Sequence, residues 1–150
     1  MLSLRPAKHV DFEHYKPYFV ADYSVEITQN YGKDIEASRR QAEAEIQHSF
    51  PQGVPLQNNY LMCIEVTHDS KLSVVGYLWF SGEPESKQAF ICDFYVLESF
   101  RNTGYGKRAF KALEELLLAE HHIKVIKLRV AYTNSRALKL YNDIGFKATG

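Results

Sequence analysis

The sequence has 150 residues, the size of one ordinary domain, and 45% of them are apolar, enough for one sizeable core. Its 18 basic residues balance 18 acidic residues, which argues against a nucleic-acid binder that relies on neutralising phosphates. No apolar run reaches the length of a membrane span. Cys63 and Cys92 lie in apolar, strand-like runs, so we expect buried free thiols and a cytoplasmic protein. The sequence contains no Cys/His cluster with the spacing of metal ligands, and we predict no metal site.

The first two thirds of the chain predict a strand, a helical region and three further strands. Residues 2–5 form a short strand that Pro6 ends, and residues 8–31 are polar with scattered aromatics, which favours helix. Residues 34–50 predict a clearer helix that Asp34 caps and that Pro51 and Gly53 end. Residues 60–67, 72–80 and 88–97 are apolar, and the second run is continuous enough for a strand covered on both faces.

A glycine-rich turn at residues 101–106 then leads into a helix. The amphipathic stripe of this helix is formed by Ala109, Ala112, Leu113, Leu116 and Leu117. Residues 124–132 alternate between apolar and basic side chains, as in a half-buried strand. A last helix is expected to begin at Asn134 and to end at Gly145, and a partial strand begins at Phe146.

The turn at residues 101–106 has the features of an anion site. Gly104 and Gly106 allow the backbone to curl and to present its amides, and the next helix adds its unpaired N–H groups. Lys107 and Arg108 oppose the helix dipole, which a bound anion would offset. A solvated Gly- and Lys-rich turn is the alternative. Neither the Walker pattern nor the dinucleotide fingerprint fits the spacing.

Three blocks of the sequence, in order, resemble the GNAT superfamily of N-acetyltransferases, and the N-terminal third, with Phe50-Pro51-Gln52-Gly53, resembles a bacterial subgroup of it. The first is the strand Asp93-Phe94-Tyr95-Val96 followed by the R-x-x-G-x-G loop of residues 101–106. The second is residues 130–132 with Asn134 and Arg136-Ala137, and the third is Leu140-Tyr141 with Gly145-Phe146. The resemblance covers residues 60–150 and, more loosely, the N-terminal third. It implies one acetyltransferase domain over residues 1–150.

The resemblance also implies a fold. We expect an α/β (α+β) architecture in which helices flank a mixed, mostly antiparallel sheet, with a V-shaped splay between two central strands. The last strand or hairpin of the family is short or missing here, because only residues 146–150 remain. Two alternatives would explain the short C-terminal strand. Either the chain is truncated, or a neighbouring chain completes the sheet in a homodimer.

The resemblance assigns roles to individual residues. Acetyl-CoA would be the co-substrate, with its pantetheine arm paired to the backbone of the strand and its pyrophosphate held by the loop amides and a lysine. The residues that correspond to this cofactor site are Phe94, Tyr95, Val96, Arg101, Asn102, Thr103, Gly104, Tyr105, Gly106, Lys107 and Asn134. Tyr141 corresponds to the general acid that protonates the departing thiolate. From position alone, Tyr141 could equally be a core aromatic, and Asn134 a helix cap.

The general base is less defined, because the family does not fix its position. Asp93 is the best-placed candidate, since it is the one charge within residues 89–97; a structural carboxylate is the alternative. Glu83 and Glu85 could line the acceptor site, and Glu65 is a weaker candidate.

We therefore predict an enzyme that transfers an acetyl group directly to a primary amine of a small molecule, peptide or protein. The aromatic residues of the N-terminal third would suit many amines or could simply form core. A non-catalytic acyl-CoA-binding sensor is the alternative, and a nucleotide-phosphate binder of another kind fits the later blocks less well.

Overall fold

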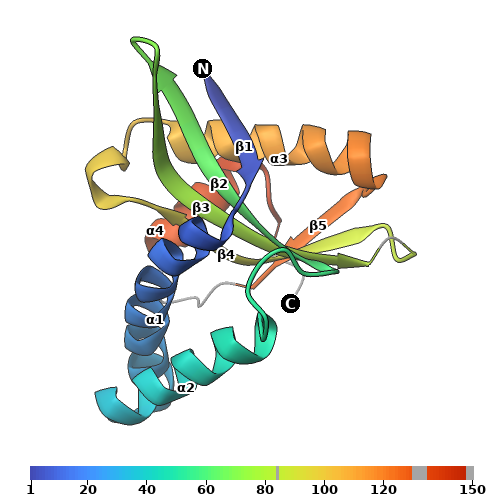
Figure 1. Cartoon of the computed structure of the whole chain (residues 1–150). Helices are drawn as coiled ribbons and strands as arrows, with labels where there is room; N and C mark the ends of the chain where they lie inside the picture. The colour runs from blue at the N-terminus through green and yellow to red at the C-terminus, as the bar shows by residue number, and fades with distance from the viewer. Residues whose placement is uncertain (84, 130–134, 148–150) are drawn as a thin grey trace.

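The computed structural model describes residues 1–83, 85–129 and 135–147 (Figure 1). Five strands form one sheet in the order β1-β2-β3-β4-β5. The first four strands are antiparallel to their neighbours, and β5 is parallel to β4. The elements in chain order are β1 (Leu2–Pro6), α1 (His9–Tyr31), α2 (Ile35–Ser49), β2 (Asn59–His68), β3 (Lys71–Glu83), β4 (Gln88–Val96), a 3-10 turn η1 (Glu98–Phe100), α3 (Tyr105–His121), β5 (Val125–Leu128) and α4 (Ser135–Ile144).

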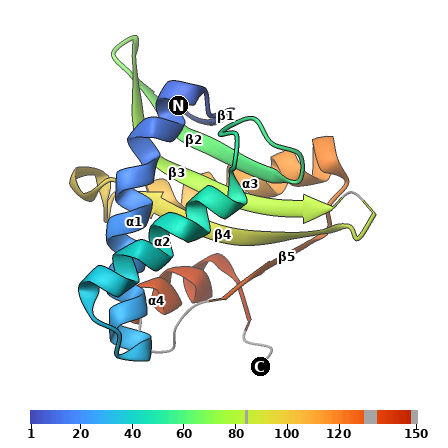
Figure 2. The ribbon, with the colours of Figure 1, turned by 60° about the horizontal axis from the view of Figure 1, so that its bottom comes forward.

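Helices cover both faces of the sheet. The paired helices α1 and α2 pack on one face, and α3 runs across the other (Figures 1 and 2). Strand β3 alternates accordingly: Tyr77 and Trp79 face the core under α1 and α2, while Leu78 and Phe80 face α3. The prediction of a strand covered on both faces is therefore confirmed for β3.

Local signals in the sequence explain where the N-terminal helices end. The side chain of Asp34 accepts a hydrogen bond from the amide of Ala37 at 2.8 Å and caps α2, as predicted. Helix α1 is a single element of 23 residues and ends at Gly32, which adopts a φ of 67°. The continuous α1 places side chains along most of the neighbouring sheet face.

A β-bulge in β4 determines which side chains face α1. Trp79 pairs with Asp93, but the next residue, Phe80, pairs with Ile91, so Cys92 has no partner on β3. Before the bulge, Ile91 packs in the core under α3; after it, Phe94 takes that side. In a regular strand Ile91 and Asp93 would share a face; the bulge at Cys92 breaks that alternation and leaves Asp93 facing α1.

The second half of the chain departs from the sequence expectations in two ways. Cys92 is exposed and not buried, because it is the extra residue of the bulge, whereas Cys63 is buried as expected. Strand β5 ends at Leu128, and its pairing with β4 runs only from Gln88 to Ile91. The V-shaped splay stays a prediction, because residues 130–134 lie outside the described part of the chain.

The expected strand from Phe146 onward is not formed at residues 146 and 147, and residues 148–150 are outside the described ranges. Gly145 does end α4, with a φ of 117°, and Phe146 donates its amide to the carbonyl of Tyr141 at 2.9 Å. In the described ranges, none of the helices combines the length and the apolar character needed to cross a membrane.

Candidate active site

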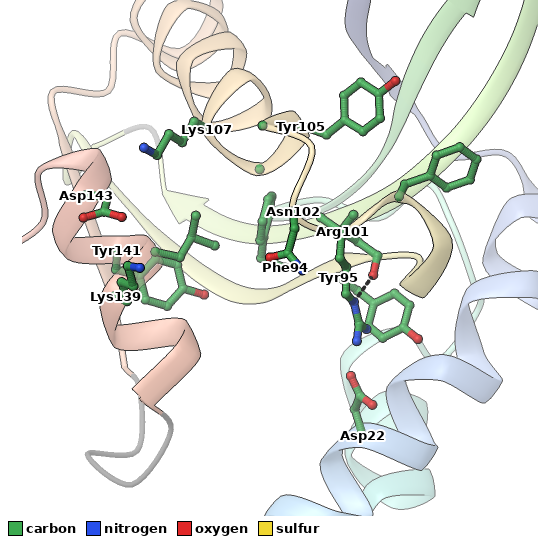
Figure 3. Close-up of a pocket in the computed structure, with 15 residues that line it drawn as sticks. Asp22, Phe94, Tyr95, Arg101, Asn102, Tyr105, Lys107, Lys139, Tyr141 and Asp143 are labelled. Carbon is green, nitrogen blue, oxygen red and sulfur yellow. Dashed lines mark hydrogen bonds between the residues drawn. The ribbon is translucent and has the colours of Figure 1, made fainter.

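A cavity of about 520 Å³ lies where the end of β4 meets the start of α3 (Figure 3). Helix α4 closes its opposite side, and α1 contributes Asp22. The described residues that line it are Asp22, Phe94, Tyr95, Val96, Phe100, Arg101, Asn102, Gly104, Tyr105, Gly106, Lys107, Lys139, Leu140, Tyr141 and Asp143. The structure therefore brings together most of the predicted cofactor residues. Thr103 is not among the lining residues, and Asn134 lies outside the described residues.

The loop before α3 lines this cavity with Arg101, Asn102 and Gly104. Asn102 and Gly104 have φ values of 62° and 86°, in the left-handed region, and a Cβ at Gly104 would meet nothing within 4 Å. In the described part of the chain, the first α3 amide with a backbone partner is that of Arg108, which donates to the carbonyl of Gly104 at 3.2 Å. The amides of Tyr105, Gly106 and Lys107 are thus left for another acceptor.

Two loop residues have other partners. The amide of Arg101 donates to the carbonyl of Glu98 at 3.3 Å, and its Nε donates to the carbonyl of Val96 at 2.8 Å. The hydroxyl of Thr103 donates to the carbonyl of Phe100 at 2.6 Å. These bonds hold the loop against the end of β4, so Arg101 and Thr103 shape the site through their own contacts.

The electrostatics of the cavity are mixed: Arg101 and Lys107 line it near the start of α3, and Lys139 lines it from α4. The first turn of α3 contains no acidic residue, and Lys107 lines the cavity. Asp22 and Asp143 line the cavity from α1 and α4. The combination of free amides, the helix N-terminus and Lys107 suits a phosphate or pyrophosphate group.

Tyr141 lies at the boundary between this cavity and a second one. Its ring packs edge-on against Phe110 and Phe146, with centroid distances of 5.8 and 5.7 Å, and its hydroxyl points into the space between α4 and β4 (Figure 3). Burial, followed by the negative charges of Asp93 and Glu26, raises the pKa of Tyr141 to about 12. The hydroxyl therefore holds its proton at neutral pH and is able to donate it.

The second cavity measures about 710 Å³ and lies between α1, α2 and the sheet. It shares Asp22, Phe94 and Tyr141 with the first cavity, so the two meet at these side chains. The described residues that line it are Phe19, Asp22, Tyr23, Glu26, Ile27, Asn30, Tyr31, Glu45, Ser49, Trp79, Phe90, Ile91, Cys92, Asp93, Phe94, Leu128, Arg129 and Tyr141.

Asp93 faces this second cavity and is held by α1. The hydroxyl of Tyr15, which is fully buried, donates a hydrogen bond of 2.5 Å to Oδ2 of Asp93. Burial raises the pKa of Asp93 to about 6, and the Tyr15 bond opposes that rise. A carboxyl group that titrates near neutrality is suited to accept and release protons.

Of the other predicted carboxylates, the two whose side chains the structure describes, Glu65 and Glu85, do not line either cavity. Glu65 pairs with Arg5 at 2.9 Å, and Glu85 is exposed in the turn between β3 and β4, outside the lining of both cavities. The side chain of Glu83 lies outside what the structure describes. The sequence did not predict Tyr15 as the partner of Asp93, and it did not predict that Asp22 and Glu26 line the second cavity. The one available signal was the four-residue spacing of Asp22 and Glu26, which places both on one face of α1.

Comparison with known proteins gives a family match over most of the chain. The model of the family described as Acetyltransferase (GNAT) family matches residues 15–146. The chain is 29% identical over 153 aligned positions to the N-acetyltransferase YycN of Bacillus subtilis, covering 99% of this chain and 94% of the relative. It is 28% identical to the N-acetyltransferase YdgE of the same organism, covering 98% and 92%.

Solved structures agree with the fold. The crystal structure of the YycN acetyltransferase of Bacillus subtilis superposes with a TM-score of 0.90 at 28% identity, covering 100% of this chain and 94% of that one. Spermidine N-acetyltransferase from Vibrio cholerae, solved with CoA and spermine, superposes with a TM-score of 0.67 at 15% identity, covering 99% and 82%. The latter likeness shows the shared fold.

Proposed function

Because this chain belongs to the acetyltransferase (GNAT) family, we propose that it transfers an acetyl group from acetyl-CoA directly to a primary amine. The observation that carries this proposal is the meeting of two cavities at Tyr141 and Phe94. One cavity has amides and a lysine at a helix start, which suit a diphosphate. The other has a carboxylate that titrates near neutrality, which suits an amine. Residues 1–150 would act as one catalytic domain.

The first cavity fits coenzyme A on features of its own residues. Gly104 leaves open space beside the backbone, and Lys107 adds a positive charge beside the amides of α3. Phe94, Tyr95 and Val96 continue from this site along β4, where an extended pantetheine chain could pair with the backbone. The bound thioester would supply the activated acetyl group.

The second cavity supplies the proton acceptor. An amine attacks only in its neutral form, so its proton must leave before or during attack. Asp93 would take that proton, directly or through water, because its pKa of about 6 leaves it ionised but only moderately acidic at neutral pH. Tyr15 holds the carboxylate in place from α1.

Tyr141 supplies the proton donor. The bond from the acetyl carbon to sulfur breaks as the new carbon–nitrogen bond forms, and the electron pair goes to sulfur. The hydroxyl of Tyr141 would donate its proton to that sulfur, and the packing of its ring against Phe110 and Phe146 holds it in position.

The test is the Tyr141→Phe variant, assayed for release of free coenzyme A thiol with a panel of primary amines. General acid catalysis contributes about 10²–10⁴-fold, so we expect kcat to fall by about 10²-fold or more while coenzyme A still binds by calorimetry. Tyr18→Phe, on α1 outside the lining of both cavities, is the matched control. Unchanged turnover in Tyr141→Phe would refute the acid role. Coenzyme A binding by the wild-type protein without turnover of any amine would favour a non-catalytic acyl-CoA sensor.

A further inference from the structure

The second cavity carries more negative charge than proton transfer alone requires. Asp22 and Glu26 come from α1, Glu45 from α2 and Asp93 from β4, and all four line it. Arg129 is the one cation among the described lining residues. We propose that the acceptor is a primary amine joined by an alkyl chain to a second ammonium group, that is, a small diamine or polyamine. This proposal rests on the proposed function.

The spacing of the carboxylates suits two charges on one molecule. Asp22 lies where the two cavities meet, and Glu26 follows one turn later on the same helix, about 6 Å further along its axis. This separation is comparable to that of the two ammonium groups in a short alkyl diamine. One nitrogen would lie near Asp93 and Tyr141, and the other near Glu26 and Glu45.

The negative charges in this cavity repel one another. Within the ranges that the structure describes, no cation forms an ion pair with Glu26 or Glu45. Partial burial and the negative charge of Asp22 raise the pKa of Glu26, and Asp22 and Glu26 in turn raise that of Asp93. A bound cation would relieve this repulsion, whereas an acceptor with a carboxylate tail would add to it.

The remaining wall suits an alkyl ammonium chain. Phe19, Tyr23, Tyr31, Trp79 and Phe90 line the same cavity. Aromatic faces attract ammonium groups and also cover methylene groups. The volume of about 710 Å³ falls in the usual range of small-molecule sites, which favours a free diamine over a folded protein acceptor.

Three primary amines with the same carbon chain and different tails test this proposal. Putrescine has a cationic tail, n-butylamine a neutral one and γ-aminobutyrate an anionic one. We expect kcat/KM to be highest for putrescine and lowest for γ-aminobutyrate, with the preference for putrescine shrinking as salt is added. Equal kcat/KM for the three amines would overturn the proposal and leave acetyl transfer intact.

Substitutions at Glu26 test whether this carboxylate causes the preference for an amine with a cationic tail. Glu26→Gln should lower the ratio of kcat/KM for putrescine to that for n-butylamine about fivefold, the effect of one partly exposed ion pair. Glu26→Lys should lower it further and raise turnover of γ-aminobutyrate. Glu43→Gln removes the same charge from an exposed position of α2 outside the cavity, and should keep the wild-type ratio. A ratio unchanged in both Glu26 variants would overturn the assignment.

Binding separates this proposal from the proposed function. Putrescine is titrated by calorimetry into the protein saturated with coenzyme A. Putrescine that binds but is never acetylated would support the diamine site and refute acetyl transfer. Acetylation of n-butylamine without detectable binding of putrescine would support acetyl transfer and refute the diamine site. The absence of both binding and turnover would overturn both proposals.

Discussion

Replacing Asp93 by Asn should stabilise the fold while it removes activity. Burial raises the pKa of Asp93 from an ordinary value of 3.8 to about 6. At 1.36 kcal/mol for each unit of pKa, ionising this carboxyl group costs about 3 kcal/mol more in the folded protein than in the unfolded chain. Asn has the same shape and no charge, and its carbonyl can still accept the hydrogen bond from Tyr15.

The pH dependence of this effect has a definite sign. A carboxyl group whose pKa is raised on folding adds most stability below its unfolded pKa and loses that contribution as the pH rises through the folded value. The free energy of unfolding of Asp93→Asn should therefore match wild type below about pH 4. It should exceed wild type by up to about 3 kcal/mol at about pH 8, with the change falling between 3.8 and about 6.

The assay is urea unfolding of both proteins at several pH values, together with kcat/KM for an acetylated amine. We expect kcat/KM to fall by about 10²–10⁴-fold, the contribution of a general base. Glu43→Gln, an exposed change of the same charge, should alter neither quantity. Lower stability of Asp93→Asn at about pH 8 would refute the reasoning, because it would show that the carboxylate serves the structure.

Three further substitutions test other parts of the site. Tyr15→Phe removes a hydrogen bond from the Asp93 carboxylate, so its pKa should rise and the acidic limb of the kcat/KM profile should move up by about one pH unit. Gly76→Ala would place a Cβ 2.3 Å from the carbonyl oxygen of Tyr95, so urea unfolding should show a loss of about 1–3 kcal/mol. Lys107→Gln should weaken coenzyme A binding a few-fold in calorimetry, and less at high salt, because it removes a charge beside the α3 amides.

Each of these substitutions has a matched control in the chain. Tyr18→Phe removes a hydroxyl from the same helix as Tyr15 and should leave the acidic limb in place. Gly82→Ala would bring a Cβ 3.3 Å from a terminal methyl of Ile123, which can move, and should destabilise less than Gly76→Ala. Lys111→Gln lies one turn further along α3, outside the lining of the first cavity. An effect in a control as large as that in its partner variant would contradict the corresponding explanation.

Local signals predicted the elements well. Asp34 has the residue type and spacing of a helix cap, and it caps α2 as predicted. The glycine-rich loop leads directly into α3, also as predicted. Both features depend on residues within a few positions of one another. The resemblance to the acetyltransferases likewise came from short motifs, and the family match over residues 15–146 confirms it.

Contacts between distant segments could not be predicted. Tyr15 and Asp93 are separated by 78 positions, and nothing in either segment indicates the other. Glu83 and Glu85 are sequence-based candidates for the acceptor site because they follow the predicted strand that ends at Phe80. The carboxylates that line the second cavity together with Asp93 come from α1 and α2, which tertiary packing places against β4. The expectation of a buried Cys92 was wrong because a bulge leaves little trace in an apolar run.

The bulge at Cys92 makes the chemistry of this site depend on the backbone geometry of β4 at a single residue. The side chain of Cys92 is exposed, and residue 92 has no place in the register of pairs between β3 and β4. If Cys92 instead took a regular place in the pairing with β3, Asp93 and Phe94 would exchange faces, and a carboxylate would enter the apolar core beneath α3. The irregular backbone at residue 92, and not the side chain there, therefore decides which face of the sheet carries the carboxylate.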